Sequence, residues 1–235
     1  MTDALYLDDS YLRIWTARVV SLKDDTYVVL DKTAFYPTGG GQPSDTGVIR
    51  KEGQAFRVVF VGKFNGTISH EVDAPGLAVG DIVSCEIDWQ RRYALMRAHT
   101  ASHVLSAVLL KTAHAKITGN QLGLDKSRMD FSMDDYSPEK LQQFVNAANS
   151  LLAKCIPITI SYITREQARA KPELARLAKG LLGKITTLRV VTIGEVDEQA
   201  DGGTHVKNTQ EVGAIRLLKT DNKGKNNRRL YFELV

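Results

Sequence analysis

Short runs of alternating polar and hydrophobic residues fill the chain between Leu12 and Asp88. The run at residues 82–88 alternates at a period of two, which is typical of a strand with one buried face. The pair Asn65-Gly66 separates two such runs and favours the tight turn of a β-hairpin. This spacing predicts a small sandwich or barrel with strands at residues 14–20, 27–30, 56–61, 67–70 and 82–88.

The pattern changes from strand to helix at Asp88-Trp89. Residues 90–113 contain no Gly, Pro, Asp or Glu, and their hydrophobic side chains recur at helical spacing, which predicts one long helix. A second helix is expected to begin at Ser137, a suitable N-cap that is followed by proline, and to end near residue 154. Thr164 opens a third, shorter helix with the spacing of a capping box.

Further β-like runs lie between and after these helices, at residues 128–133, 156–162, 187–193, 213–218 and 229–234. This order predicts an α+β fold, with an antiparallel sheet that has helices packed on one face. We therefore expect two domains, a small β-barrel-like domain at residues 1–88 and an α+β domain at residues 89–235. The polar, basic stretch at residues 219–229 is expected to form a mobile hairpin loop.

The composition is that of an ordinary globular protein. Hydrophobic residues make up 43% and charged residues 25% of the 235 residues, which excludes a disordered chain, a collagen-like repeat and a membrane bundle. The N-terminus has no signal-peptide pattern, and two cysteines, Cys85 and Cys155, do not make a disulfide framework. These features favour the reducing cytoplasm and indicate no membrane partner.

Charge is unevenly distributed along the chain. Residues 1–88 carry 8 Lys and Arg against 13 Asp and Glu, whereas residues 89–235 carry 23 against 14. A basic second part favours a polyanionic partner such as a nucleic acid, although basic residues also serve simply to solubilise a surface. Two sets of side chains are candidates for phosphate contacts, namely Arg91, Arg92, Arg97, Lys111 and Lys116 on the first helix and Lys219, Lys223, Lys225, Arg228 and Arg229 in the basic stretch.

Two short segments offer ligands for a metal ion. His99 and His103 are four residues apart on the long helix, so their imidazoles lie on one face. Asp201 and His205 flank Gly202-Gly203, which lets the backbone fold tightly enough for the two side chains to converge. Zn²⁺ accepts histidine nitrogen and carboxylate oxygen, often with one position left for water or substrate. The alternatives are a polar helix face for the first pair and, for the second, a turn-capping aspartate and a histidine within the sheet.

Three consecutive glycines, Gly39, Gly40 and Gly41, are followed by Gln42 and bracketed by two prolines. Such a loop can approach a ligand closely or expose several backbone N–H groups to an anion. It lacks the Gly-Lys-Ser/Thr ending of a phosphate-binding P-loop. A simple turn between strands is the alternative interpretation.

Three segments resemble, in their order along the chain, the motifs of the alanyl-tRNA synthetase editing domain: Phe35-Tyr-Pro-Thr-Gly-Gly-Gly-Gln42, His99-Thr-Ala-Ser-His103 and Asp201-Gly-Gly-Thr-His205-Val-Lys-Asn-Thr. Over essentially its whole length the chain is similar to the AlaX trans-editing proteins of the medium-length class, which are free-standing relatives of that domain. The resemblance implies a β-barrel-like domain followed by an editing domain of the kind shared with threonyl-tRNA synthetases. No segment resembles an aminoacylation domain, so we expect editing without charging of tRNA.

The resemblance also implies an activity and a site. The activity is hydrolysis of the ester that joins a wrong amino acid to the acceptor end of tRNA(Ala), chiefly serine, with glycine as a second candidate. One Zn²⁺ per chain would be held by His99, His103, Asp201 and His205. The family usually has cysteine at the position of Asp201, and the harder carboxylate changes the expected affinity and metal preference.

The resemblance extends to candidate catalytic and selectivity residues. Thr118 is similar to a family threonine that contacts the seryl hydroxyl, and its alternative role is that of a strand-entry residue. The glycine-rich loop supplies the other candidates, Gly40, Gly41 and Gln42, if it folds over the site. Whether zinc activates water directly or anchors the substrate is open at this point.

Two other functions compete with the editing interpretation. A non-catalytic tRNA- or RNA-binding protein with a structural zinc is one, but closed structural sites favour cysteine-rich ligand sets. A zinc hydrolase of small molecules is the other, and the basic second part and the absence of a His-Glu-x-x-His motif argue against it. Neither cysteine has a histidine nearby in the sequence, so a covalent intermediate is not expected. The sequence leaves the oligomeric state open.

Overall fold

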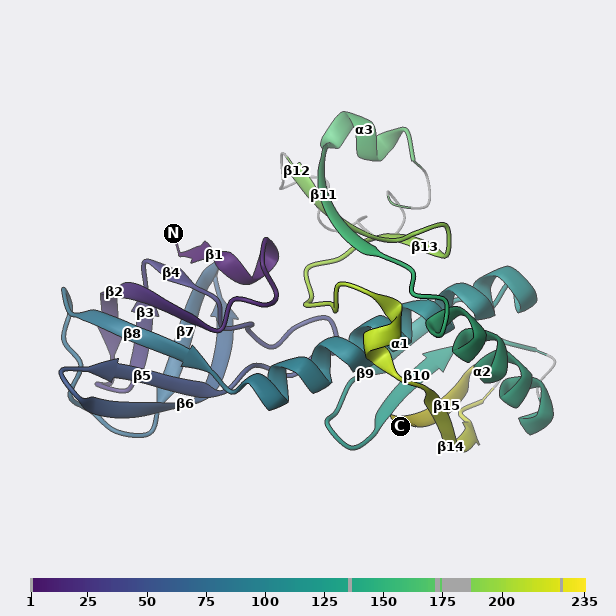
Figure 1. Cartoon of the computed structure of the whole chain (residues 1–235), viewed down its shortest axis with the longest axis horizontal. Helices are drawn as coiled ribbons and strands as arrows, with labels where there is room; N and C mark the ends of the chain where they lie inside the picture. The colour runs from purple at the N-terminus through teal and green to yellow at the C-terminus, as the bar shows by residue number, and fades with distance from the viewer. Residues whose placement is uncertain (1, 135–136, 172–173, 175–186, 225) are drawn as a thin grey trace. The chain divides into compact units, whose positions relative to one another are not determined.

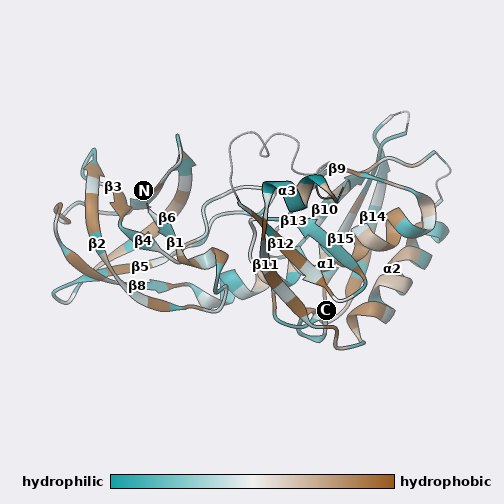
Figure 2. Cartoon of the chain, turned by 90° about the horizontal axis from the view of Figure 1, so that it is seen from above, coloured by the Kyte–Doolittle hydropathy of each residue, from teal (hydrophilic) through white to brown (hydrophobic). Residues whose placement is uncertain are grey.

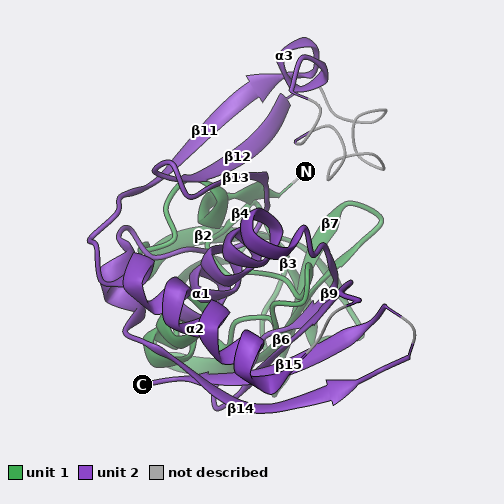
Figure 3. Cartoon of the chain, turned by 90° about the vertical axis from the view of Figure 1, so that its right-hand side faces the viewer, with its two compact units in different colours: residues 1–96 green, residues 97–235 purple. Residues whose placement is uncertain are grey.

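The computed structural model describes residues 2–134, 137–171, 174, 187–224 and 226–235. The chain divides into two compact units, Met1–Met96 and Arg97–Val235 (Figure 3). The boundary falls inside helix α1 (Trp89–Ala113), which begins where the sequence pattern changes from strand to helix. The first unit contains a β-barrel and the second is a mixture of helices and sheets (Figure 1), so the predicted α+β class with an N-terminal barrel is confirmed.

A closed barrel of antiparallel strands forms the first unit. Its strands follow one another around the barrel in the order β2 (Ile14–Lys23), β3 (Tyr27–Leu30), β7 (Thr67–Val72), β6 (Gln54–Phe64), β5 (Gly47–Lys51) and β8 (Ile82–Ile87). The five predicted strands are all present, whereas β5 was not predicted because its short run is barely alternating. A barrel has no free sheet edges, and closure therefore gives each of these six strands a partner on both sides.

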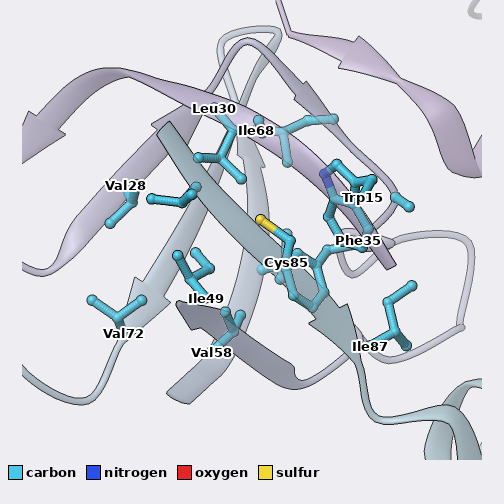
Figure 4. Close-up of a cluster of buried hydrophobic side chains, with 14 of the residues drawn as sticks. Trp15, Val28, Leu30, Phe35, Ile49, Val58, Ile68, Val72, Cys85 and Ile87 are labelled. Carbon is cyan, nitrogen blue, oxygen red and sulfur yellow. The ribbon is translucent and has the colours of Figure 1, made fainter. Parts of the chain in front are cut away.

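The barrel interior is a continuous hydrophobic core (Figure 4). Along β2 and β8 every second side chain is buried at the start of the strand, as the period of two requires. Trp15, Phe35, Ile49 and Cys85 all contribute buried side chains to this core. A short parallel pair, β1 (Asp3–Ala4) with β4 (Lys32–Thr33), and the 3-10 turn η1 (Leu5–Leu7) complete the elements of this unit.

The second unit has a four-stranded antiparallel sheet in the order β14 (Ile215–Asn222), β15 (Arg228–Leu234), β10 (Ser127–Phe131) and β9 (Ile117–Gln121). Helix α2 (Pro138–Leu152) lies against β14 and buries one stripe, including Leu141, Val145 and Leu152. Ser137 caps this helix by accepting a hydrogen bond from the Lys140 N–H, as predicted. Figure 2 shows hydrophobic segments, in brown, alternating with more polar ones along α2.

A second, three-stranded antiparallel sheet contains β11 (Ile158–Thr164), β12 (Thr187–Ile193) and β13 (Asp197–Ala200). The strands of this unit therefore separate into two sheets, where the sequence predicted one. Thr164 and Gln167 form the predicted capping box of α3 (Arg165–Arg169). The 3-10 turn η2 (Thr209–Val212) follows β13 along the chain.

The basic stretch at residues 219–229 lies in a hairpin, as predicted, although strands rather than loop make up much of it. Strand β14 continues to Asn222 and β15 begins at Arg228, so most of the stretch belongs to a hairpin. Its side chains pair across the two strands, with Lys219 opposite Tyr231 and Asp221 opposite Arg229. Within the described residues, no helix has the length and hydrophobic character needed to cross a membrane.

Candidate metal centre

Helix α1 supplies the first two side chains of the candidate centre. Because residues four apart lie one turn above each other on a helix, the rings of His99 and His103 come to within 5.1 Å of each other, centroid to centroid. Both are buried, with exposed fractions of 3% and 8%. The helix is therefore the rigid support of this half of the site.

The loop after β13 supplies the other two side chains. Asp201 folds back over Gly202-Gly203, and its Oδ2 accepts a hydrogen bond from the Gly203 N–H at 2.7 Å. The same oxygen lies 3.0 Å from Nε2 of His205. A Cβ at Gly203 would stand only 2.1 Å from Cε1 of His99, so glycine is what allows the loop to approach the helix this closely.

The four side chains converge. One ligand atom from each of His99, His103, Asp201 and His205 lies within 4.8 Å of the others. The rings of His99 and His205 are nearly stacked, with centroids 4.4 Å apart, and Nε2 of His99 lies 3.6 Å from Oδ1 of Asp201. Three imidazole nitrogens and one carboxylate oxygen make a donor set that suits Zn²⁺. The four side chains therefore converge, as the sequence predicted.

Two of the histidines have hydrogen-bond partners on the side away from the cluster. Nδ1 of His103 lies 2.9 Å from Oδ2 of Asp197, the first residue of β13. Nδ1 of His205 lies 3.1 Å from the hydroxyl of Thr100, which is on α1. With Nδ1 engaged in this way, Nε2 is the nitrogen that each ring offers to a metal ion.

The charges in the cluster suit a cation. Burial holds the pKa of His99 well below its ordinary value and also lowers the pKa of His205, so both are neutral and able to bind a metal. Burial acts against the charged form of Asp201, but the neighbouring His99 and His205 outweigh it and hold the carboxyl pKa well below its usual range. For His103, burial is outweighed by the hydrogen bond to Asp197 and by the charge of Asp201, and the pKa is raised.

Arg189 supports the loop that carries Asp201. This arginine lies on β12, is 6% exposed, and donates from Nη1 to the Asp201 carbonyl oxygen at 2.7 Å. The same nitrogen is 3.8 Å from the Asp201 carboxylate. Sequence reasoning did not single out Arg189, Asp197 or Thr100. Of these three residues, only Thr100 lies within one of the motifs named above, His99-Thr-Ala-Ser-His103.

The other predicted site residues lie on separate elements. Thr118 is on β9, its side chain is exposed, and its hydroxyl donates to Oδ1 of Asn227 at 3.2 Å. Gly40 and Gly41 occupy the tip of a two-residue turn, where both have positive φ, 56° and 84°. Gly39 and Gln42 close this turn through two backbone hydrogen bonds. The turn belongs to the barrel unit and Thr118 to the second unit, and their catalytic roles stay predictions.

Arg92 is not available for phosphate contacts, contrary to the sequence prediction. It is fully buried and forms an ion pair with Asp45, which is also fully buried. Its guanidinium donates in addition to the carbonyl oxygens of Ser10 and Ala34. Lys116 is not on the first helix either, because α1 ends at Ala113.

Several other basic candidates are engaged within the protein. Arg97 donates to the carbonyl of Val212, and Lys111 to that of Glu195. In the hairpin, acidic neighbours accept from most of the basic side chains, as the pairs Arg229–Asp130, Lys219–Asp221 and Lys223–Asp221 illustrate. Arg228 is buried and donates to backbone carbonyls, and Lys225 lies outside the described residues.

Comparison with known proteins connects this geometry to a family. Residues 15–91 match the family model described as tRNA synthetases class II (A). Residues 188–231, which include Asp201 and His205, match the threonyl and alanyl tRNA synthetase second additional domain. The two matches therefore fall on the barrel and on the part of the second unit that carries the candidate ligand loop.

Individual relatives match over the full length of the chain. The alanyl-tRNA editing protein AlaX-M of Methanosarcina barkeri is 49% identical over 242 residues, and the match covers 100% of both chains. AlaX-M of Saccharolobus solfataricus is 42% identical over 235 residues, which cover 99% of this chain and 98% of the relative. The alanine–tRNA ligase of Pyrobaculum calidifontis is 37% identical over 227 residues, 94% of this chain but 25% of the ligase. The chain thus belongs to the AlaX-M family of alanyl-tRNA editing proteins.

Proposed function

We propose that this protein is a trans-editing hydrolase that removes serine from mischarged Ser-tRNA(Ala), and glycine from Gly-tRNA(Ala), at a zinc site. Its support is the cluster of His99, His103, Asp201 and His205, whose ligand atoms lie within 4.8 Å of one another in a chain that matches alanyl-tRNA editing proteins along its whole length. The matching segment also recurs as one quarter of an alanine–tRNA ligase. An editing module that acts apart from the synthetase is consistent with both observations.

The four side chains of the cluster would hold one Zn²⁺ per chain, next to which the ester would bind. The bound ion would supply Lewis-acid chemistry at the ester carbonyl or at the attacking water. Burial keeps His99 and His205 neutral, so their nitrogen lone pairs are available without loss of a proton. Asp201 contributes the negative charge that partly neutralises the ion. The ester is already activated, and the chain's task is to place water and stabilise the developing oxyanion.

Discrimination between serine and alanine requires polar groups that recognise a hydroxyl. An apolar pocket rejects one extra hydroxyl poorly, whereas a pocket that hydrogen-bonds it leaves polar groups unpaired when alanine binds. We assign this role to Thr118, with Gly40, Gly41 and Gln42 as the loop that would cover the aminoacyl group. The exposed hydroxyl of Thr118 supports its assignment, since the bond it donates to Asn227 can be exchanged for one to a ligand.

The acceptor end of tRNA(Ala) is the partner that this proposal requires. Lys111 and Lys116 are exposed cations of the second unit and are candidates for phosphate contacts, which for Lys111 would replace its hydrogen bond to the Glu195 carbonyl. Arg92 is removed from this set by its burial, and the hairpin cations Lys219 and Lys223 would have to exchange their contacts with Asp221 for contacts with phosphate. A contact of that kind is more sensitive to salt than a buried one.

Deacylation of seryl-, glycyl- and alanyl-tRNA(Ala), measured side by side with the zinc-loaded protein, tests the function. We expect fast release of serine and little release of alanine. His103→Ala should lose both bound zinc and activity, because it removes one of the candidate ligands. Intact Ser-tRNA(Ala) after incubation would reject the hydrolase, and binding of tRNA without turnover would favour the alternative of an RNA-binding protein with a structural zinc.

A further inference from the structure

A carboxylate outside the four candidate ligands is bound to one of them. Asp197 begins β13, and its Oδ2 lies 2.9 Å from Nδ1 of His103. Both are nearly buried, with 9% of the His103 side chain and 10% of the Asp197 side chain exposed. An ionised carboxylate can only accept a hydrogen bond, so the ring carries a proton on Nδ1, and in the neutral ring the Nε2 lone pair is left for the cluster.

A second side chain holds this carboxylate in place. Nε2 of Gln199 donates to both oxygens of Asp197, at 3.0 and 2.9 Å. The two residues are two apart on β13 and share a face of the strand, as its period requires. Asp197 itself lies opposite Ile193 of β12, which ties the strand into its sheet. A chain of hydrogen bonds thus runs from Gln199 through Asp197 to His103 on α1.

The group that faces the second histidine, His205, differs chemically from the Asp197 carboxylate. Nδ1 of His205 meets the neutral hydroxyl of Thr100 at 3.1 Å, a longer contact than that between His103 and Asp197. A hydrogen bond to a charged acceptor is roughly twice as strong as one between neutral groups. Of these two rings, that of His103 is therefore held more firmly, and it is the one that faces a carboxylate on the side away from the cluster.

We propose that Asp197 is a positioning residue for the metal site: it holds the His103 ring with Nε2 toward the cluster and makes that nitrogen a better donor, with Gln199 fixing the carboxylate behind it. The inference rests on the proposed function, because it takes His103 as a zinc ligand. Partners of this kind behind a ligating histidine fix its tautomer and raise its basicity. Asp197 touches neither substrate nor metal in this account.

Zinc affinity is the direct test, measured by competition with a chromophoric chelator for the full-length wild type, Asp197→Asn and Asp197→Ala. We expect Asp197→Ala to bind zinc about 10–100-fold more weakly and Asp197→Asn to fall between the two. The amide keeps the shape and one oxygen acceptor but loses the charge. Thr100→Val should weaken binding less than Asp197→Ala, because it removes a neutral partner.

Asp130→Asn is the matched control. Asp130 is another largely buried carboxylate of the same unit, and it accepts hydrogen bonds from Arg229 rather than from a histidine of the cluster. We expect its zinc affinity to equal that of the wild type. A general effect of losing a buried carboxylate would instead appear in both Asp130→Asn and Asp197→Asn and would overturn the proposal.

The visible spectrum of the Co²⁺-substituted protein separates positioning from mere structural support. Re-orientation of one imidazole changes the ligand field, so Asp197→Asn should alter the Co²⁺ bands even if it folds normally. Unchanged zinc affinity together with an unchanged Co²⁺ spectrum in Asp197→Asn would overturn the proposal, as would a wild type that binds no metal. If these metal readouts respond as expected while Ser-tRNA(Ala) stays intact, the hydrolase function fails and the role of Asp197 stands.

Discussion

Two adjacent glycines in the ligand loop have different surroundings. A Cβ at Gly203 would stand 2.1 Å from Cε1 and 2.3 Å from Nδ1 of His99, whereas a Cβ at Gly202 would meet nothing within 4 Å. His99 is 3% exposed, so its ring has little space into which to move. Only one of the two glycines is therefore required by the candidate metal centre.

Replacement of each glycine by alanine tests this difference. Gly203→Ala should push the loop away from α1, separate Asp201 from His99, and weaken zinc binding, with an overpacking cost of about 1–3 kcal/mol in the free energy of unfolding. Gly202→Ala is the matched control and should leave both quantities near the wild type. Zinc titration and thermal unfolding of the two variants are the measurements, and equal behaviour of the two would contradict the packing described here.

Protonation of one buried residue, His70, should make the barrel sensitive to acid. Burial lowers the pKa of His70 from 6.5 to about 4, and the hydrogen bond to the Val28 carbonyl opposes this only in part. Its other nitrogen, Nε2, lies 2.8 Å from the hydroxyl of Thr33. Because the unfolded chain binds the proton more readily than the folded one, the stability is intact above pH 6.5 and declines as the pH falls toward 4.

The size of this effect follows from the shift. Between pH 6.5 and 4 the wild type should lose about 3 kcal/mol of unfolding free energy through His70. His70→Gln keeps a donor and an acceptor but does not titrate, so its stability should lack this part of the pH dependence. Chemical denaturation of both proteins across this pH range measures the difference between their unfolding free energies. The titration of all other groups is common to both proteins and cancels in that difference. Parallel curves would show that His70 is not a buried neutral residue.

At the scale of elements, a buried ion pair connects the start of α1 to the glycine-rich turn. Arg92 of α1 pairs with Asp45, and Oδ2 of Asp45 also accepts from the backbone N–H of Tyr36 at 2.6 Å. Tyr36 and Asp45 lie on either side of the turn at Gly39–Gln42, and the hydroxyl of Tyr36 donates to the Gly39 carbonyl. The turn therefore has a fixed base and an exposed tip.

Arg92→Met should destabilise the protein by about 3–5 kcal/mol, because it leaves the Asp45 carboxylate buried without its cation. Arg57→Met removes an arginine whose side chain is 76% exposed in its pair with Asp73, and it should cost far less, because solvent screens an exposed pair. The double variant Arg92→Met/Asp45→Leu should recover part of the loss. Unfolding free energies from denaturant titration measure all three, and equal effects at the buried and exposed pairs would contradict the account.

Elements with strong local signals were predictable from the sequence. The N-cap at Ser137 and the capping box at Thr164 lie where they were expected, because the side chain and backbone groups that form them are neighbours in the chain. Strand β13 was missed, since its residues Asp197–Ala200 are mostly polar and only pairing with β12 makes them a strand. The burial of Arg92 was missed for a similar reason, because its partner Asp45 is 47 residues away.

At the scale of the whole molecule, the candidate centre joins parts of the chain about one hundred residues apart. The spacing of His99 and His103 and the glycines between Asp201 and His205 predicted these four side chains, because each pair is local. Asp197 and Arg189 complete the surroundings of the cluster, and no motif in the sequence marks them. The candidate ligands could thus be recognised from the sequence, whereas the residues that surround them required the three-dimensional structure.

The central claim is that these four side chains hold one zinc ion on which deacylation depends. Its most direct measurement is the rate of Ser-tRNA(Ala) hydrolysis by chelator-stripped protein as zinc is added back in known amounts. We predict negligible activity without metal, a rise in proportion to added zinc, and a plateau at one equivalent per chain. Full activity of the stripped protein, or a rise with zinc that His103→Ala shares, would contradict it.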